Sequence, residues 1–380
     1  MHKAIGKTHK GTEDIAALEI EELINGKTLS KENTVVVFET KDILDIPKLC
    51  YKTQSLFKVL YYLGEFAVHK ELEATVSEIK KIKIDYNNWV KKDTIINVDC
   101  EREGAHDFRS VDISGALSSH IKSQTGNVVS LKEFDVTFYT YIYDNTGYLG
   151  IDFSGKDLSK RDYKIFITSS AFKGTAAYAL LRIAEYNPKK SLMDPFCGVG
   201  IIPIEAALYG SKLSVNYYSK EKFAFKKLLP FEKTDFDSFF AKIDKEISTK
   251  NLKITVIDAQ QKNIKFAEKN AKIAGVIKHL NFSRQDMEWL DTKMDKGSFD
   301  CIVSYPMQLS KDKDSKPIEK AYNELFYQAE YVLKKTGNIT LLSMETDVLT
   351  KHANTHGFKV LHERELYFGR QKMKIISFGR

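Results

Sequence analysis

The chain contains 380 residues, of which 43% are hydrophobic and 29% are charged, and its formal net charge is +7. The length favours two or three domains, and the hydrophobic fraction excludes a wholly disordered chain. No apolar run is long enough to span a bilayer and the N-terminus lacks a signal-peptide pattern, so we expect a cytoplasmic protein without a membrane partner. The positive charge permits a polyanionic partner, although a lysine-rich composition alone produces the same balance.

The four cysteines, Cys50, Cys100, Cys197 and Cys301, are far apart in the sequence and form no C-x-x-C pair. This spacing argues against a zinc site and against a disulfide framework, and it fits a reducing cytoplasm. We therefore expect no metal ion.

The first 75 residues alternate helical and extended patterns. A capped helical pattern follows Gly11, and the β-branched run Thr34–Phe38 predicts a short strand. Asp42–Tyr51 predicts a second helix and Val59–Phe66 a second strand. This order predicts a small α+β, ferredoxin-like module over residues 1–75. A packing module without a site of its own is the alternative.

Residues 76–165 contain a predicted hairpin. Val136–Tyr143 alternates strongly between apolar and polar positions, Asp144–Gly147 is a turn, and Tyr148–Phe153 returns as the second strand. The remaining predicted elements of this region are helices at Leu72–Lys83 and Ser110–Ser123 and a strand at Ile95–Cys100.

Basic and aromatic residues before and after this hairpin are suited to holding RNA phosphates and stacking on bases. The candidate RNA-binding residues are Arg102, His106, Arg109, Lys160, Arg161, Tyr163 and Lys164. From composition alone, an ordinary solvated charged surface is the better supported explanation.

From residue 166 onward strands and helices alternate, which predicts a doubly wound α/β sheet. The stretch Asp194–Leu208 organises this region: a strand end and a glycine turn lead into an apolar helix, and Gly198 and Gly200 let the backbone turn sharply beside a ligand. Other predicted strands are Lys253–Asp258, Leu280–Asp286, Phe299–Ser304, Gly337–Ser343, Phe358–Phe368 and Lys372–Phe378, and other predicted helices are Lys173–Ala184, Thr234–Ile247, Ile264–Ala274 and Ala321–Leu333.

Polar residues stand at the predicted carboxyl ends of these strands, where ligands of open α/β sheets bind. Asp258 is placed to accept hydrogen bonds from a ribose diol, and Asp286 to accept one from an adenine amine, with Met287 packing on the ring. The absence of a lysine-bearing phosphate loop favours a nucleoside without phosphates, such as S-adenosylmethionine, over ATP or NADP. Singly, each aspartate is better explained as a helix cap or turn residue; together with Asp194 they favour a cofactor site.

These residues resemble the THUMP-containing RNA methyltransferases that modify guanine N2 in tRNA or rRNA, and the resemblance covers nearly the whole chain. Asp194–Leu208 resembles motif I of that family, and Arg102–Ser110 and Leu158–Tyr163 resemble its THUMP region. The insertion Phe223–Lys227 is similar to one in the rRNA-modifying branch, whereas the length is closer to the archaeal tRNA-modifying branch.

The resemblance implies three domains: a ferredoxin-like domain at 1–75, a THUMP RNA-binding domain at 76–165 and a Rossmann-like class I methyltransferase domain at 166–380. It also implies that Lys173–Thr175 helps to hold the methionine end of S-adenosylmethionine. The implied cofactor-binding residues are Lys173, Gly174, Thr175, Asp194, Phe196, Cys197, Gly198, Gly200, Asp258, Ala259, Asp286 and Met287.

The sequence departs from the family at motif IV, where Asn/Asp-Pro-Pro-Tyr/Phe is replaced by Ser304-Tyr305-Pro306-Met307. In the family a side-chain carbonyl and a backbone carbonyl accept hydrogen bonds from the target amine, and an aromatic ring stacks on the base. These four residues are the implied catalytic residues. Ser304 is still able to accept one hydrogen bond, and Tyr305 or Tyr217 and Tyr218 are the candidates to replace the missing aromatic ring.

The leading hypothesis is a monomeric enzyme that methylates an exocyclic amine of RNA, guanine N2 in tRNA, with the base flipped out of its stack. The alternatives are an rRNA guanine-N2 methyltransferase and a catalytically silent RNA-binding protein of the same fold, which the altered motif IV motivates. A small-molecule methyltransferase is a weaker alternative, because it leaves the first 165 residues without a role.

Overall fold

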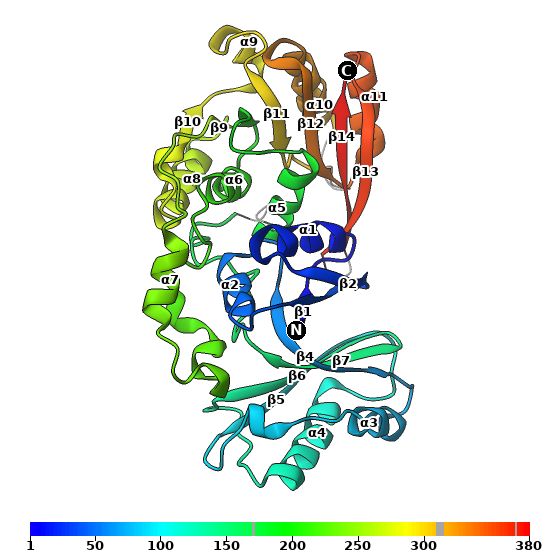
Figure 1. The fold of residues 1–380 in the computed structure, drawn as a ribbon. Helices are drawn as coiled ribbons and strands as arrows, with labels where there is room; N and C mark the ends of the chain where they lie inside the picture. Colours follow the sequence, from blue (N-terminus) through cyan, green and yellow to red (C-terminus); the bar gives the residue numbers. More distant parts are fainter. Residues whose placement is uncertain (169–171, 309–314, 369–370) are drawn as a thin grey trace. The chain divides into compact units, whose positions relative to one another are not determined.

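The computed structural model describes residues 1–168, 172–308, 315–368 and 371–380, and the chain divides into two compact units (Figure 1). Unit 1 contains Met1–Thr8, Ala16–Leu158 and Tyr217–Lys245, and unit 2 contains His9–Ile15, Ser159–Asn216 and Glu246–Arg380. Within the described residues, no helix combines the length and apolarity needed to cross a bilayer.

Unit 1 is built on one seven-stranded sheet with the order β2-β3-β1-β4-β7-β6-β5. The sheet is continuous across the two predicted modules, because β4 pairs antiparallel with β1 on one side and with β7 on the other. The predicted hairpin is present as the antiparallel pair β6 and β7. The strands are β1 His2–Lys7, β2 Lys27–Glu32, β3 Val35–Thr40, β4 Lys58–Ala67, β5 Ile96–Glu103, β6 Val136–Tyr143 and β7 Thr146–Asp152, and the helices are α1 Glu13–Ile24 (its first three residues in unit 2), α2 Asp45–Lys52, α3 Leu72–Lys80, α4 Ser110–Thr125 and α7 Phe236–Asp244.

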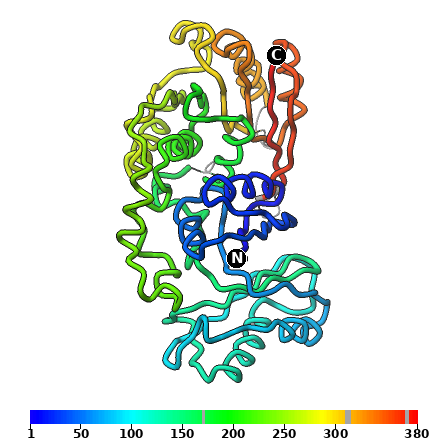
Figure 2. The backbone as a smooth tube through the Cα atoms, in the orientation of Figure 1, coloured from blue at the N-terminus to red at the C-terminus, as the bar shows by residue number. Residues whose placement is uncertain are grey.

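The segment Tyr217–Lys245 lies between two elements of unit 2 in the sequence but packs in unit 1, as the chain trace of Figure 2 allows the reader to follow. Its five buried phenylalanines join the same hydrophobic core as Phe153 of the hairpin. Burying a phenylalanine contributes about 2 kcal/mol, so this aromatic cluster holds the segment firmly in unit 1. The five residues are Phe223, Phe225, Phe231, Phe236 and Phe240.

Unit 2 confirms the predicted doubly wound α/β sheet, with the order β10-β9-β8-β11-β12-β14-β13. The first five strands in this order are parallel, and β14 pairs antiparallel with both β12 and β13. The strands are β8 Leu192–Asp194, β9 Ile254–Asp258, β10 Leu280–Arg284, β11 Phe299–Ser304, β12 Leu333–Ser343, β13 Lys359–Phe368 and β14 Gln371–Gly379, and the helices are α5 Gly174–Ile183, α6 Ile201–Ser211, α8 Gln261–Ile273, α9 Leu290–Lys293, α10 Lys316–Val332 and α11 Thr346–Thr355.

Alternate residues of the unit 2 strands enter two hydrophobic cores, one on each face of the sheet. In β8, Leu192 packs with α5, α6 and α8, whereas Met193 packs with α10 and α11. The chain passes from β8 to β9 and β10 on one side of β8, and then crosses to β11 on its other side. The strand order therefore reverses at β8. This reversal opens a crevice at the carboxyl ends of β8, β9 and β11, which is where open α/β sheets bind ligands.

Candidate active site

A cavity of about 990 Å³ lies at the carboxyl ends of the parallel strands of unit 2. Its wall is formed by the glycine turn after β8, the ends of β9 and β10, the loop after β11 and the first turns of α10. The lining residues that the sequence singled out are Phe196, Gly198, Asp258, Ala259, Asp286, Met287, Tyr305, Pro306 and Met307. Nine of the predicted site residues therefore meet at one cavity.

The two glycines of the turn serve different purposes. Gly198 has φ +52°, and a Cβ atom built on it would meet nothing within 4 Å, so its backbone faces open space at the cavity. Gly200 has φ +83° and caps α6, and a Cβ atom there would lie 2.8 Å from the Cβ of Ala267 in α8. Gly198 keeps the turn open for a ligand, whereas Gly200 allows α6 and α8 to approach each other.

Asp258 is held in one orientation by three donors. Its Oδ2 accepts a hydrogen bond from the Gly198 amide at 3.0 Å, and its Oδ1 accepts from the Gln260 amide at 2.9 Å and from Asn263 Nδ2 at 3.0 Å. A carboxylate offers about four acceptor sites, so capacity remains for a hydroxyl group in the cavity. By contrast, Asp286 is exposed, and its carboxylate makes no hydrogen bond to any described residue.

Asp194 and Ser304, at the ends of neighbouring strands β8 and β11, form a buried pair. The Ser304 hydroxyl donates to Asp194 Oδ1 at 2.5 Å, and both side chains are almost completely buried. Burial, together with the nearby charge of Asp258, raises the pKa of Asp194 to about 7, against the lowering effect of hydrogen bonds from Ser304 and the Phe196 amide. Ser304 is absent from the cavity wall and its hydroxyl donates to Asp194, so its expected acceptance of a hydrogen bond from the target amine stays a prediction.

The loop after Ser304 is fixed through its main-chain carbonyls. Gln308 Nε2 donates to the Pro306 carbonyl at 2.6 Å, and the hydroxyl of Tyr322 in α10 donates to the Met307 carbonyl at 2.5 Å. The Oε1 atom of Gln308 accepts from the Ser343 hydroxyl and from the Met344 amide, which ties the loop to the end of β12. The Tyr305 carbonyl, by contrast, accepts no hydrogen bond from the described residues.

The side chains that could stack on the target base are placed differently from the aromatic ring of the family pattern. The ring of Tyr305 is half-buried, lines the cavity and contacts the ring of Phe172 edge-on, with centroids 5.0 Å apart. Met307 is 52% exposed at the cavity wall. Tyr217 and Tyr218 belong to unit 1. Tyr305 is therefore the motif IV residue that places an aromatic ring at the cavity wall.

Lys173, Gly174 and Thr175 are absent from the cavity wall. A Cβ atom on Gly174 would lie 2.5 Å from Glu205 Oε1, and the Thr175 hydroxyl is hydrogen-bonded to His9 Nε2 at 2.9 Å. Lys173 is the N-cap residue of α5. These residues therefore begin α5 and pack against α6, and their expected contact with a methionine moiety stays a prediction.

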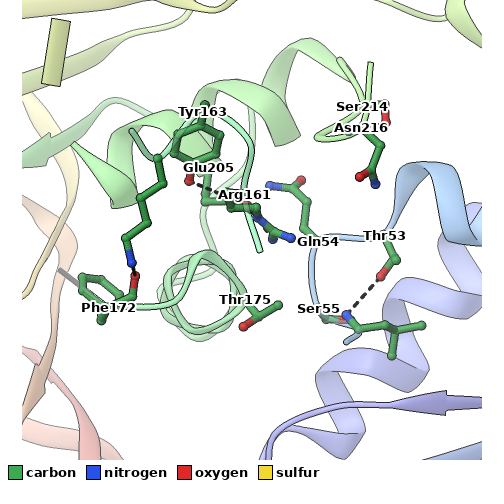
Figure 3. A network of polar contacts seen from close by, with 12 residues as sticks. Thr53, Gln54, Ser55, Arg161, Tyr163, Phe172, Thr175, Glu205, Ser214 and Asn216 are labelled. Atoms are coloured by element: carbon green, nitrogen blue, oxygen red, sulfur yellow. Dashed lines mark hydrogen bonds and ion pairs between the residues drawn. The ribbon is translucent and has the colours of Figure 1, made fainter. Parts of the chain in front are cut away.

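Arg161 and Tyr163, expected at an RNA-binding surface, are buried instead. Arg161 Nε and Nη2 donate to the two carboxylate oxygens of Glu205 at 2.7 and 3.1 Å, and the Tyr163 hydroxyl donates to Glu205 Oε1 at 2.8 Å (Figure 3). The Arg161 and Glu205 side chains are 1% and 0% exposed, and burial raises the pKa of Tyr163 well above its usual value. The buried carboxylate of Glu205 in α6 needs these donors, which explains why both side chains point inward.

The other candidate RNA-binding residues occupy different environments. In unit 1, Arg102 Nη1 donates to the Gly104 carbonyl and is hydrogen-bonded to His106 Nδ1, each at 2.8 Å. Arg109 is exposed and pairs with Asp112 in the first turn of α4. In unit 2, Lys160 is exposed, whereas Lys164 Nζ donates to the Phe172 carbonyl at 2.8 Å.

Sequence reasoning missed three residues that shape the cavity: Asn263, Gln308 and Tyr322. Asn263 follows Asp258 by five positions at the start of a predicted helix, so among the three residues its contact with the carboxylate was the easiest to predict from the sequence. Gln308 and Tyr322 act on main-chain carbonyls, which leaves no pattern in the sequence. Among the described residues, no three His, Cys, Asp or Glu side chains gather in a way that would hold a metal ion.

Comparison with known proteins supports the predicted order of a THUMP region followed by a methyltransferase fold. Residues 161–374 match the family described as RMKL-like, methyltransferase domain, and residues 73–152 match the THUMP domain. The tRNA (guanine(6)-N2)-methyltransferase of Methanocaldococcus jannaschii is 27% identical over 94% of this chain and 95% of that protein. The enzyme of the same name from Archaeoglobus fulgidus is 26% identical over 97% of this chain and 90% of that protein. The ribosomal RNA large subunit methyltransferase K/L of Photobacterium profundum is 21% identical over 75% of this chain and 41% of that protein.

Two solved structures share the fold along the whole chain. SMU.472, described as a methyltransferase and complexed with SAH, has a TM-score of 0.81 at 21% identity and covers 100% of this chain and 98% of that one. TrmN from Thermus thermophilus has a TM-score of 0.72 at 18% identity, with 100% of both chains covered.

Proposed function

Because the chain belongs to the RMKL-like methyltransferase family and carries a THUMP domain, we propose that it transfers a methyl group from S-adenosylmethionine to guanine N2 of tRNA. The observation that carries the proposal is the meeting of Gly198, Asp258, Asp286 and the loop after β11 at one cavity. The tRNA assignment is supported by similarity to two archaeal tRNA (guanine(6)-N2)-methyltransferases over nearly the full chain.

The residues of the cavity fit S-adenosylmethionine. Gly198 leaves open space for a ligand to approach the backbone, Asp258 keeps acceptor capacity toward a ribose diol, and Asp286 has an unengaged carboxylate for an adenine amine. Met287, partly buried beside Asp286, provides an apolar surface for the ring. When bound, the cofactor supplies a methyl group made electrophilic by the positively charged sulfur.

We assign the target base to the loop after β11. The Pro306 and Met307 carbonyls are engaged by Gln308 and Tyr322, whereas the Tyr305 carbonyl accepts no hydrogen bond from the described residues, and we assign it as the acceptor for the target amine. By accepting a hydrogen bond from an N–H of the amine, this carbonyl orients the nitrogen lone pair toward the methyl group. The ring of Tyr305 and the side chain of Met307 then cover the base and exclude water. Catalysis by this chain therefore rests on positioning more than on acid–base groups.

RNA binding is assigned to the THUMP domain of unit 1. Arg102, His106 and Arg109 are the predicted residues that the structure leaves half-buried or exposed in unit 1. Arg102 also stacks over Phe108, with its guanidinium 5.7 Å from the ring centroid. Phosphate contacts of this kind make binding depend on salt, and each lost contact reduces that dependence by about one unit of slope.

One observation favours the catalytically silent RNA-binding alternative. Ser304, which stands where the family has an amide or carboxylate side chain, is directed to Asp194 and absent from the cavity wall. If a side-chain acceptor is essential, the protein binds the cofactor and RNA without transferring the methyl group.

The test uses the full chain, tritiated S-adenosylmethionine and total tRNA or rRNA from a strain that lacks the gene. We expect label in tRNA, recovered as N2-methylguanosine by mass spectrometry, and no label with the Asp258→Ala variant. Label in rRNA alone would favour the rRNA alternative. Cofactor binding measured by calorimetry without label in either RNA would establish the silent alternative and overturn the proposed transfer.

A further inference from the structure

A short segment ahead of α5 forms part of the cavity wall. Residues 164–168, here named the strap, follow the buried Arg161 and Tyr163, and the strap residues Ile167 and Thr168 line the cavity. Ile167 is 60% exposed, and the strap belongs to no helix or strand. A wall segment without secondary structure needs other interactions to keep its position beside a ligand.

Asn270 of α8 provides such interactions through both the oxygen and the nitrogen of its side-chain amide. Its Oδ1 accepts from the Phe166 amide at 3.0 Å, and its Nδ2 donates to the Phe166 carbonyl at 2.9 Å and to the Val199 carbonyl at 3.0 Å. The side chain is fully buried. Val199 lies between the two glycines of the turn, so one amide group joins the strap to the glycine turn.

Aromatic contacts hold the same point of the strap against α8. The ring of Phe166 contacts the ring of Phe266, with centroids 5.5 Å apart, and Lys269 Nζ lies 4.7 Å from the centroid of the Phe166 ring. Lys164 Nζ donates to the Phe172 carbonyl, which ties the beginning of the strap to the chain that follows it. Phe166 is thus fixed by its main chain and by its ring, while its neighbour Ile167 lines the cavity.

We infer that Asn270 is a positioning residue for the cofactor: it sets the distance between the strap and the glycine turn without touching the ligand. This inference rests on the proposed function, because it takes the cavity as the S-adenosylmethionine site. An unsatisfied buried main-chain group is costly, so losing the amide would move the strap, the turn or both. The residues of the cofactor site would then still be present, but they would be less precisely positioned.

The test is Asn270→Asp in the full chain. The substitution keeps the shape and the acceptor for the Phe166 amide, but it replaces the donor to the Phe166 and Val199 carbonyls by an oxygen. At pH 8 we expect the Kd for S-adenosylmethionine, measured by calorimetry, to rise about tenfold relative to wild type. In methyl transfer the KM for the cofactor should rise by a similar factor, while kcat at saturating cofactor changes less.

Protonation offers a readout that general destabilisation would not give. Burial raises the pKa of a carboxyl group, and the neutral carboxyl of the variant is again a hydrogen-bond donor. The ratio of variant Kd to wild-type Kd should therefore fall between pH 8 and pH 6. A ratio near one at both pH values, or a raised ratio that does not fall at pH 6, would overturn the inference.

Asn338→Asp is the matched control. Asn338 Nδ2 donates to the Ala184 carbonyl at 3.0 Å in the same unit and lines no part of the cavity. We expect a lower Tm with a Kd within about twofold of wild type; an equal loss of affinity would mean that stability alone governs binding. Phe166→Ala, which loosens the strap without burying a charge, should also weaken cofactor binding. If the wild type itself binds no S-adenosylmethionine, the proposed function fails before this inference is tested.

Discussion

The two halves of the cavity are ordered by different means. On the side proposed to bind the cofactor, the Asp258 side chain is presented to the cavity and oriented by the Gly198 and Gln260 amides and by Asn263. On the side proposed to bind the target base, the strand-end side chain Ser304 donates to Asp194. There the main chain of the loop is held in place by side chains that reach in from other elements.

The half that contains Asp258 matches the family pattern, whereas the half that contains Ser304 departs from it at motif IV. The Asp194–Ser304 hydrogen bond links the two halves, because Asp194 ends β8 ahead of the glycine turn and Ser304 ends β11. Variants that separate cofactor affinity from methyl transfer test this comparison.

The largest effect is expected for Asp258→Asn. The side-chain NH2 group of the asparagine is a donor and faces N–H donors that the aspartate accepted from. The charge-assisted hydrogen bonds that are lost are worth about 1.5–3 kcal/mol each. We expect the Kd for S-adenosylmethionine, measured by calorimetry, to rise about 100-fold.

Asp300→Asn is the control for this variant. Asp300 lies in β11 well before its carboxyl end, where its Oδ2 accepts from the Ser191 amide and hydroxyl, both at 2.8 Å. The substitution is the same, and the cavity is not involved. We expect a lower Tm and unchanged cofactor affinity. Equal losses of affinity in the two variants would contradict the assignment of Asp258.

Ser304→Ala distinguishes a target-amine acceptor from a donor to Asp194. As a donor, Ser304 satisfies a buried carboxyl, so its loss should lower the free energy of unfolding by about 1–2 kcal/mol and reduce methyl transfer about tenfold. Denaturant unfolding and tritium transfer measure the two quantities. Ser304→Thr keeps the hydroxyl and should recover part of both. A loss of transfer with unchanged stability would instead return Ser304 to the role of amine acceptor.

The linking residue Asp194 predicts a pH dependence. Its pKa is raised from the usual 3.8 of an aspartate to about 7 by burial and by Asp258, so the fold retains a proton that the unfolded chain has already lost. Its contribution to stability is therefore complete below about pH 4 and declines as the pH rises through about 7, by at most about 1.4 kcal/mol per pH unit. Thermal unfolding between pH 5 and pH 8 should show this decline, and Asp194→Asn should reduce it.

The same titration should appear in cofactor binding. A cationic ligand favours the ionised carboxylate, so affinity for S-adenosylmethionine is expected to rise by up to about tenfold as the pH increases from 6 to 8. Asp194→Asn should flatten the profile. An affinity that is independent of pH in the wild type would place the positive charge of the cofactor away from Asp194.

The family, the Rossmann-like sheet and the THUMP domain were predictable from the sequence, because motif I and the alternation of strands and helices are local patterns. The continuous sheet of unit 1 was not, because it depends on the pairing of β4 with β7, far apart in the sequence. β1 and β2 were also missed: β2 is an exposed, polar strand without the β-branched residues that mark strands.

The direction in which a side chain points was the second feature that could not be predicted from the sequence. Arg161 and Tyr163 look like surface residues in a basic loop, and only the buried Glu205, more than 40 positions later, explains why they turn inward. The role of Ser304 was predicted from its place in motif IV, whereas Asp194, to which its hydroxyl donates, is 110 positions earlier. In both cases a buried carboxyl group determined the outcome, and the sequence does not show which carboxyl groups are buried. The ligand contacts assigned to Asp258 and Asp286 stay predictions.

The smallest effect separates the two halves most cleanly. Tyr322→Phe removes the hydroxyl that donates to the Met307 carbonyl and leaves the fully buried ring in place. One neutral hydrogen bond is worth about 1 kcal/mol, so kcat should fall about fivefold while the Kd for S-adenosylmethionine stays the same. Tyr186→Phe is the matched control, since that buried hydroxyl has no hydrogen-bond partner among the described residues and its loss should leave kcat unchanged. A Tyr322→Phe variant that lost cofactor affinity together with kcat would show that the loop after β11 also shapes the cofactor half, and that the two halves are one site.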